Sequence, residues 1–332
     1  MLQLLAIVPL IRSHGLMVRP AIWGDAEKAM WGYDRNGDLN NLGCGKLNLP
    51  EDIEFDDEGG TELDCPWNWF SGGSEIPGER TLTLAQMDPE VDCSLENTEE
   101  SHHSYPWNAP GSAPVFSPCG ALGGFPNGCV GAEKFGDVCS CDGKDRPTEA
   151  YGCGGFAYGG LAHQYDWPNA PVTEWKAGSV EDVALWFPYA NHGGGYSYRL
   201  CKTPAEGISG LTEECFQNGY LDFSGDTQWV YYGTEYIKSQ SKVEMNATRI
   251  TKGTFPPGSM WTTIPFSYFG EIDTVPFDMT GNPQEDPDHG HIIDKVQIPS
   301  TLEPGEYVLS FRYDCKCTSQ VFNTCANIQI TN

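Results

Sequence analysis

The sequence predicts an all-β fold, an antiparallel β-sandwich of the immunoglobulin/fibronectin-III-like kind with long disulfide-rich loop insertions. Short aromatic or β-branched segments are bounded by Gly, Pro and Asn, a pattern typical of strands joined by turns. Helical periodicity is scarce, which argues against alternating strand and helix units. Thirteen cysteines in 332 residues indicate an oxidising compartment, in which disulfides form.

Six segments are expected to be strands because each is rich in residues that favour extended backbone and ends at turn residues. They are residues 180–189, 196–200, 229–232, 261–266, 292–298 and 307–313. After the last of them come a cysteine-bearing turn and a final strand. Gln320 and Phe322 alternate on one face of the segment that enters this final strand, so both can point toward one site.

We expect one elaborated domain over residues 14–332, because no linker divides the chain. Residues 34 to 160 form a loop-rich insertion, dense in Gly, Pro, Cys and acids, that we expect disulfides to hold rather than a core of its own. The odd number of cysteines leaves at least one thiol free or joined to another molecule. Structural zinc between Cys119 and Cys153 is a weaker alternative, because the spacing is irregular.

Residues 1–13 are expected to be a signal peptide. Their apolar run suits a signal sequence and is shorter than the roughly 20 residues that span a bilayer. Cleavage after Ser13 is a hypothesis, because no positive charge precedes the run and Arg12 lies near the cut. We therefore expect a secreted, extracellular protein without a membrane anchor, glycosylated at Asn246 in its Asn-Ala-Thr acceptor sequence.

The charge excludes one large class of partners. Forty-six acidic against nineteen basic side chains give a net charge of −27, which repels nucleic acid and anionic lipid surfaces. A neutral polymer such as a glucan or chitin is not repelled, and ten Trp and fifteen Tyr supply flat faces for sugar rings. Core packing is the ordinary role of such residues, and the count alone does not separate the two.

Two histidines are candidate metal ligands. If the mature chain begins at His14, its free amine lies within chelating distance of its own imidazole, and such nitrogen ligands favour copper. His192 lies in a loop between two expected strands, followed by three glycines that let backbone or a large flat substrate approach closely. Considered singly, His14 fits a plain terminal residue and His192 a plain turn residue. The substrate-side candidates in this loop are Gly193, Gly194, Gly195 and Tyr196.

The remaining histidines are weaker candidates. His289 and His291 have strand-like spacing but lie in a loop rich in Asp and Pro. His163 precedes the strands that lead to His192 and is a candidate neighbour of the site. The pair at 102–103 has the character of an exposed loop.

Three sequence elements, taken together and in this order, are informative about the family. They are the His-Gly start at His14, the Asn-His-Gly-Gly-Gly-Tyr loop at 191–196, and the C-terminal run over 307–330. Together they resemble the copper-dependent lytic polysaccharide monooxygenases, whose domain is also called the chitin-binding type-4 domain. The segment from Arg19 to Gly45 is similar to that family's early loop. The likeness is weak over residues 47–152.

The resemblance implies a role for each matching residue. The terminal amine and Nδ1 of His14, with Nε2 of His192, would form a three-nitrogen copper site, the histidine brace. Phe322 matches the axial position, where an unreactive ring keeps a protein oxygen donor away. Gln320 matches a hydrogen-bond donor beside the site, although an ordinary strand residue explains it equally well. Asn327 stands where the related pattern often has Asp.

The activity implied is that of a copper-dependent monooxygenase that oxidatively cleaves an insoluble β-linked, chitin- or cellulose-like polysaccharide at C1 or C4. It would use an external electron donor and O2 or hydrogen peroxide, and we expect a monomer. Two alternatives stay open: a non-catalytic carbohydrate-binding, chitin-binding or cell-wall protein on the same fold, and a copper-binding protein without polysaccharide activity. A glycoside hydrolase is less attractive, because carboxylate pairs such as Glu271/Asp273 and Asp286/Asp288 do not stand out from the acidic background.

Overall fold

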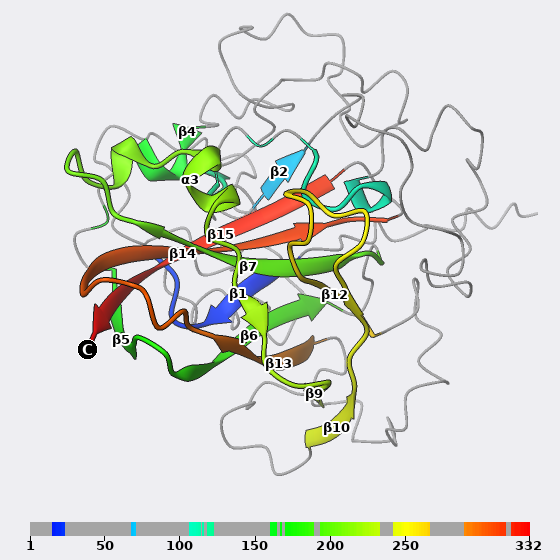
Figure 1. The fold of residues 1–332 in the computed structure, drawn as a ribbon. Helices are drawn as coiled ribbons and strands as arrows, with labels where there is room; N and C mark the ends of the chain where they lie inside the picture. Colours follow the sequence, from blue (N-terminus) through cyan, green and yellow to red (C-terminus); the bar gives the residue numbers. More distant parts are fainter. Residues whose placement is uncertain are drawn as a thin grey trace, which may run out of the picture.

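The structure is a computed structural model of the chain. It describes residues 15–23, 68–70, 106–113, 115, 118–122, 160–164, 167, 170–188, 193–232, 242–265, 289–316 and 320–332. Over these residues the chain forms two β-sheets and very little helix. The predicted β-sandwich is confirmed (Figure 1).

The first sheet has six strands in the order β1-β6-β13-β9-β10, with β8 paired to β13. Every pairing in it is antiparallel. The strands are β1 (Leu16–Arg19), β6 (Val180–Pro188), β8 (Asp222–Phe223), β9 (Thr227–Tyr232), β10 (Lys242–Asn246) and β13 (His289–Gln297).

The second sheet has nine strands in the order β11-β12-β7-β14-β15-β2-β3-β4, with β5 paired to β15. The β5–β15 pairing is parallel and the others are antiparallel, so the sheet is mixed where a purely antiparallel one was expected. The strands are β2 (Asn68–Phe70), β3 (Ala121–Leu122), β4 (Gly160–Leu161), β5 (Val172–Lys176), β7 (Gly195–Lys202), β11 (Arg249–Ile250), β12 (Trp261–Thr263), β14 (Gly305–Asp314) and β15 (Gln320–Thr331).

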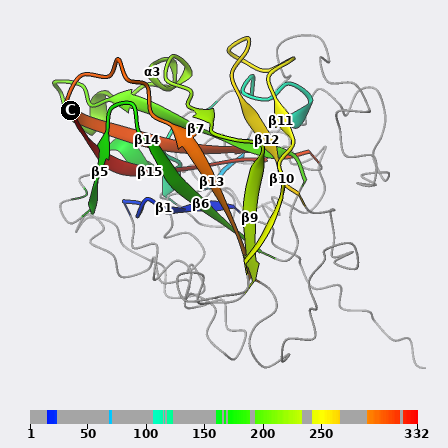
Figure 2. The same ribbon diagram turned by 60° about the horizontal axis from the view of Figure 1, so that its bottom comes forward.

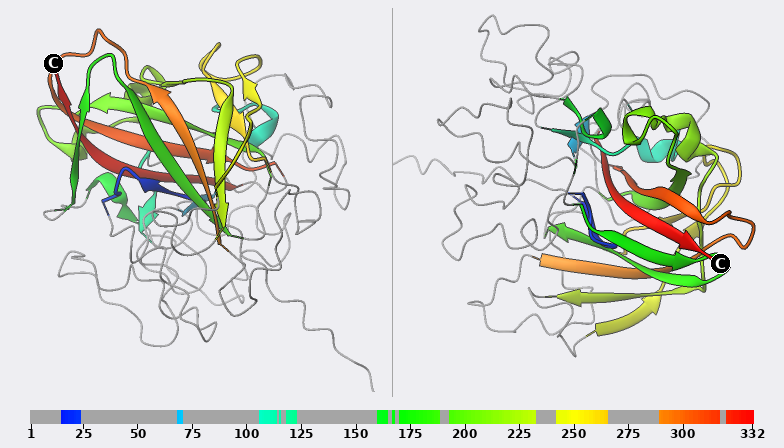
Figure 3. Two further views of the ribbon diagram at one scale, coloured as in Figure 1. Left: turned by 90° about the horizontal axis from the view of Figure 1, so that it is seen from below. Right: turned by 90° about the vertical axis from the view of Figure 1, so that its left-hand side faces the viewer.

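The core lies between the two sheets. In Figure 1 the sheet with β7, β14 and β15 lies above the sheet with β1, β6 and β13, and the right-hand view of Figure 3 shows them as separate layers. Side chains alternate along a strand, and both β6 and β14 contribute alternate residues to this core. Val183, Leu185, Leu309 and Phe311 are fully buried there.

All six expected strands are present. Expected residues 180–189, 196–200 and 307–313 correspond to β6, β7 and β14, and the other three to β9, β12 and β13. Residue 189 and residues 266–288 lie outside the described residues. Parts of the expected insertion join the sandwich as short strands: β2 pairs with β15, and β3 pairs with β2, which extends the second sheet.

The outer face of the second sheet is also covered. The one α-helix in the described part of the chain, α3 (Glu213–Gln217), lies over β7 (Figure 2). The Thr212 side chain caps it by accepting a hydrogen bond from the Cys215 amide at 3.3 Å. A disulfide from Cys215 to Cys201 ties it to β7. Three 3-10 turns are also described: η5 (Pro106–Asn108), η7 (Ala162–Gln164) and η8 (Ile208–Gly210).

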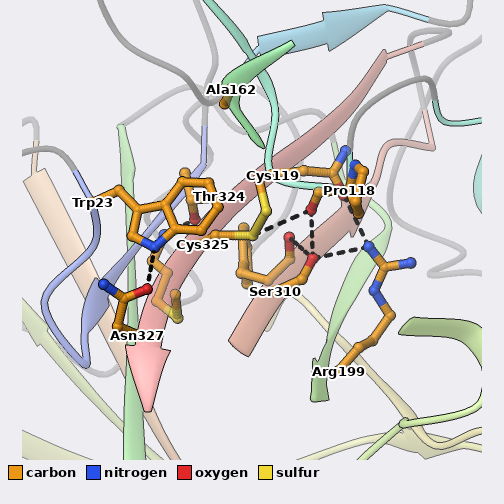
Figure 4. The surroundings of a disulfide bond; sticks show 12 residues. Trp23, Pro118, Cys119, Ala162, Arg199, Ser310, Thr324, Cys325 and Asn327 are labelled. Atoms are coloured by element: carbon orange, nitrogen blue, oxygen red, sulfur yellow. Dashed lines mark hydrogen bonds between the residues drawn. A yellow bond between two sulfur atoms is a disulfide. The ribbon is translucent and has the colours of Figure 1, made fainter. Parts of the chain in front are cut away.

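A second disulfide, Cys119–Cys325, joins residues 206 positions apart and fastens the segment around Cys119 to the outer face of β15 (Figure 4). Beside it the Ser310 hydroxyl donates to the Pro118 carbonyl at 2.6 Å, and Arg199 Nη2 donates to Ser310 Oγ at 2.9 Å. Disulfides were expected, and this one excludes Cys119 as the zinc ligand considered above. None of the helices among the described residues is long and apolar enough to cross a membrane.

Candidate functional site

The segment that follows His14 is fixed to the C-terminal strand. Leu16 pairs with Trp186 of β6, and the Met17 amide donates to Thr324 Oγ1 of β15 at 3.1 Å. Farther along, the Trp23 amide donates to the Cys325 carbonyl at 2.9 Å. These contacts hold the start of the domain against β15.

Asn327 completes this attachment. Its Oδ1 accepts a 2.7 Å hydrogen bond from the Trp23 indole (Figure 4). The Trp23 ring also stacks on Trp167 at a centroid separation of 6.1 Å. Asn327, which departs from the related pattern, therefore anchors the N-terminal segment.

Tyr313 is the centre of the candidate site. A Cβ atom added to Gly15 would lie 2.8 Å from Tyr313 Cδ1, so only a glycine lets the chain cross the ring this closely. The Tyr313 hydroxyl donates to the Gly193 carbonyl at 2.8 Å. The ring also stacks on Phe322, its partner across the β14–β15 ladder, with centroids 5.7 Å apart and planes at 25°. One buried tyrosine thus contacts three separate segments of the chain.

These contacts bear directly on the predicted copper ligands. Gly15 follows His14 in sequence and Gly193 follows His192, and both histidines lie outside the described residues. Of the predicted site, the structure brings together the residue after each ligand and the axial candidate Phe322. Phe322 is buried, and its role as the axial ring of a copper site stays a prediction.

The glycines after His192 make room for the protein's own backbone. Gly194 has φ of 90°, and a Cβ there would lie 2.2 Å from the carbonyl oxygen of Asp314. A Cβ at Gly195 would lie 2.2 Å from the Thr262 oxygen and 2.4 Å from the Trp107 ring. Two readings of these glycines were open, close backbone or a flat substrate, and the described contacts are with backbone and a buried tryptophan.

Tyr196 is a core residue, and its expected substrate-side role is wrong for the side chain. It is fully buried and its hydroxyl donates to Asp294 Oδ2 of the opposite sheet at 2.5 Å. Burial, with the neighbouring Asp294 carboxylate, raises the pKa of Tyr196 well above its usual value. Because Gly193, Gly194 and Gly195 are buried too, this stretch lies beneath the surface rather than on it.

Gln320 is the first residue of β15 and pairs with Phe70 of β2. Its side chain is outside the described part, so its predicted role beside the copper stays a prediction. The same holds for His289 and His291, the first and third residues of β13, and residues 102–103 are outside the described residues altogether. Asn246 ends β10 and is exposed, as a glycosylation acceptor must be.

His163 lies in η7 on the outer side of the second sheet. Its neighbour Ala162 packs with Trp23 and Cys325, and Cys325 faces the side of β15 opposite to Phe322. Burial lowers the pKa of His163, which favours a neutral imidazole. The structure therefore places it away from the Tyr313–Phe322 stack.

Sequence reasoning missed a cluster of buried charges behind β14. The guanidinium of Arg312 donates to both carboxylate oxygens of Asp314, at 2.7 and 3.1 Å, and to the Ala113 carbonyl at 3.0 Å. The Gly111 amide donates to Asp314 Oδ2 at 2.7 Å. Burial lowers the pKa of Arg312, but Asp314, Tyr220 and Glu213 together raise it by more, so the net shift is upward. The cluster fixes the end of β14, which carries Tyr313.

Within the described part of the chain, no three His, Cys, Asp or Glu side chains are grouped as metal ligands would be. The predicted copper ligands, His14 and His192, lie outside the described residues. The copper assignment therefore depends on the described residues that flank them.

No family model matches the chain. Among solved structures, it is similar to a chitin-binding domain from Burkholderia pseudomallei, at 12% identity and a TM-score of 0.34 over 96% of this chain and 100% of the other. It is also similar to a CBM33 protein from Bacillus amyloliquefaciens in complex with Cu(I), at 13% identity and a TM-score of 0.27 over 52% of this chain and 63% of the other. An AA10 lytic polysaccharide monooxygenase from Streptomyces lividans has 15% identity and a TM-score of 0.25 over 54% of this chain and 70% of the other. These TM-scores are low, and we therefore interpret the site from its own residues.

Proposed function

We propose that this protein is a secreted copper-dependent monooxygenase that oxidises an insoluble β-linked polysaccharide, with His14 and His192 as the copper ligands. The observation that supports it most is the position of Tyr313. Its ring and hydroxyl contact Gly15 and Gly193, the residues that follow the two histidines, and its ring stacks on Phe322.

Covalent geometry makes this contact informative. Consecutive Cα atoms are about 3.8 Å apart, so His14 and His192 each start within one residue of the same tyrosine. A histidine side chain easily spans that distance. Two segments that are distant in sequence thus bring the residues after both candidate ligands, Gly15 and Gly193, to the same tyrosine, which supports a shared site.

The donor set fits copper. A neutral amine and two neutral imidazoles are ligands that late first-row metals prefer, and copper binds such sets most tightly of the divalent ions in that series. Phe322 presents an apolar, buried ring against Tyr313 and offers no competing oxygen donor. When bound and reduced by an external donor, copper supplies one-electron chemistry that activates O2 or hydrogen peroxide for attack at C1 or C4 of a sugar.

The chain's own residues set up the proposed site in two ways. Tyr313 orients the His192 loop by its hydrogen bond to Gly193. The contact of Gly15 with the Tyr313 ring sets the direction from which the amino terminus arrives. A peptide nitrogen is a poor neutral ligand because its lone pair is delocalised into the carbonyl, so copper affinity depends on the His14 amine being free, and hence on cleavage after Ser13.

The polysaccharide assignment rests on charge. The net charge of −27 disfavours anionic partners but not a neutral glycan. Because Gly194, Gly195 and Tyr196 are buried, the glycan surface would be formed by other residues around the brace.

The test begins with secreted protein whose N-terminus is confirmed as His14 by intact mass. We expect one copper per chain by calorimetry and electron paramagnetic resonance, and oxidised oligosaccharides from chitin or cellulose only when reductant is added. His14→Ala and His192→Ala should abolish both, whereas the control His102→Ala should leave both unchanged.

Other outcomes would support one of the alternative functions or refute the proposed copper site. Glycan binding that survives in His14→Ala, with no oxidised product from either protein, would identify a carbohydrate-binding protein. Tight copper binding with no product from any wall glycan would identify a copper-binding protein. A mature N-terminus other than His14 would refute the brace.

A further inference from the structure

A group of polar side chains lies inside the sandwich, between the two sheets. On the second sheet Thr262 pairs with Tyr196 of β7 and with Arg249 of β11, so the three form one row. On the first sheet Ile293 pairs with Trp229, and Asp294 and Gln228 are the next residues along β13 and β9. The interior polar cluster is defined as Tyr196, Tyr198, Gln228, Arg249, Thr262 and Asp294.

Two contacts join the rows. The Tyr196 hydroxyl donates to Asp294 Oδ2 at 2.5 Å, and Arg249 Nη2 lies 2.9 Å from Asp294 Oδ1. The Arg249 guanidinium also lies over the Phe223 ring at 4.2 Å, and Phe223 in turn contacts the Tyr198 ring. The cluster is therefore a compact unit that bridges the sheets.

Much of its hydrogen-bonding capacity has no partner among the described residues. The atoms concerned are Gln228 Oε1 and Nε2, Thr262 Oγ1, the Tyr198 hydroxyl, and Arg249 Nε and Nη1. Gln228, Tyr198 and Thr262 are fully buried, so bulk solvent does not reach them. Native proteins rarely leave so many buried polar atoms unpaired in one place.

The chemistry of these atoms selects the ligand. Arg249 would repel a metal cation and Asp294 would repel an anion, while the pair together carries no net charge. Gln228 offers both a donor and an acceptor, as do the hydroxyls of Thr262 and Tyr198. A small neutral molecule that both donates and accepts satisfies this set, and internal water typically makes about three such bonds.

We propose that the interior polar cluster is a binding site for ordered water, which links Gln228 on the first sheet to Thr262 and Tyr198 on the second. The water then forms part of the contact between the sheets. Thr262 and Tyr196 are each one residue along their strands from the Thr263–Gly195 pair, so this site adjoins the start of β7. The proposal is independent of copper.

The test uses the full secreted chain. A high-resolution crystal structure should show water within hydrogen-bond distance of Gln228 and Thr262, and oxygen-17 relaxation dispersion should detect long-lived water in solution. Thr262→Val with Tyr198→Phe removes two hydroxyls at nearly constant volume and should remove the crystallographic water and lower the dispersion amplitude. The control Tyr307→Phe, whose hydroxyl bonds the Glu303 carbonyl instead, should change neither.

Two results would overturn the proposal: the Gln228 amide bonded directly to Thr262 or Tyr198 with no water between, or an ion at the site. If the double variant does not fold, the wild-type crystal structure alone decides between these outcomes.

Discussion

The two faces of β14 are both buried, yet they are built from opposite kinds of residue. The inner face carries Leu309, Phe311 and Tyr313, which fill the core between the sheets. The outer face carries Ser310, Arg312 and Asp314 in alternate positions, all fully buried as well. A strand with alternating apolar and polar residues usually exposes its polar face to solvent, but here segments from elsewhere in the chain cover that face.

The difference separates two tasks. Polar groups on the outer face bind the covering segment through directional contacts to Pro118, Ala113 and Gly111. The inner face fixes the candidate site through ring packing and one hydrogen bond, from Tyr313 to Gly193. Substitutions on the outer face should therefore lower mainly the stability, whereas substitution of Tyr313 should affect mainly the proposed copper binding.

The largest effect is expected from Arg312→Met, which leaves Asp314 as a buried carboxylate without its guanidinium partner, held only by the Gly111 amide among the described contacts. Such a loss costs about 3–5 kcal/mol of unfolding free energy, measurable by denaturant titration. Adding Asp314→Leu should recover part of it, because removing both charges removes the uncompensated one. Lys202→Met, which breaks the exposed pair with Glu303, is the control and should change little. If Arg312→Met loses no more unfolding free energy than the control, the outer face of β14 does not have the stabilising role inferred for it.

A smaller effect separates the two disulfides. Replacing Cys119 and Cys325 by alanine opens a closure of 206 residues, against 14 for Cys201 and Cys215. By chain entropy the first pair should cost more unfolding free energy than the second, by up to about 2 kcal/mol. Hydrogen exchange should also rise in residues 106–122 only for the first pair. Equal losses of unfolding free energy, with unchanged hydrogen exchange in residues 106–122, would show that the polar contacts alone hold this segment on the sheet.

The strands were predictable from local pattern, whereas the site contacts were not. Residues 180–189 and 307–313 have the composition and turn residues that strands need, and β6 and β14 follow them closely. β1 has only four residues and α3 only five, too few to show a period. The likeness that singled out Phe322 selected a residue that the structure places beside the Tyr313 ring.

Contacts across long stretches of chain explain what was missed. Tyr313 reaches Gly193 over a separation of 120 residues, and no local pattern encodes that hydrogen bond. The burial of Tyr196, a substrate-side candidate, was missed for a related reason. A tyrosine after three glycines resembles a loop residue, but β7 begins at Gly195 and turns that side chain toward Asp294.

The smallest change in stability, and the most selective for the site, is expected from Tyr313→Phe. It removes only the hydroxyl that donates to Gly193 and keeps the ring stacked on Phe322. The loss should be about 1 kcal/mol of unfolding free energy. If the bond also orients the His192 loop, copper affinity should fall by up to about fivefold, since 1.4 kcal/mol corresponds to a factor of ten.

Tyr307→Phe is the matched control, because Tyr307 lies on the same inner face of β14 and donates to the Glu303 carbonyl at the opposite end. It should lose similar stability with no change in the copper affinity or the paramagnetic resonance spectrum. Equal copper affinity in the two variants would mean that Tyr313 only packs, and that the position of the His192 loop is fixed by Gly194 and Gly195 against Asp314 and Thr262.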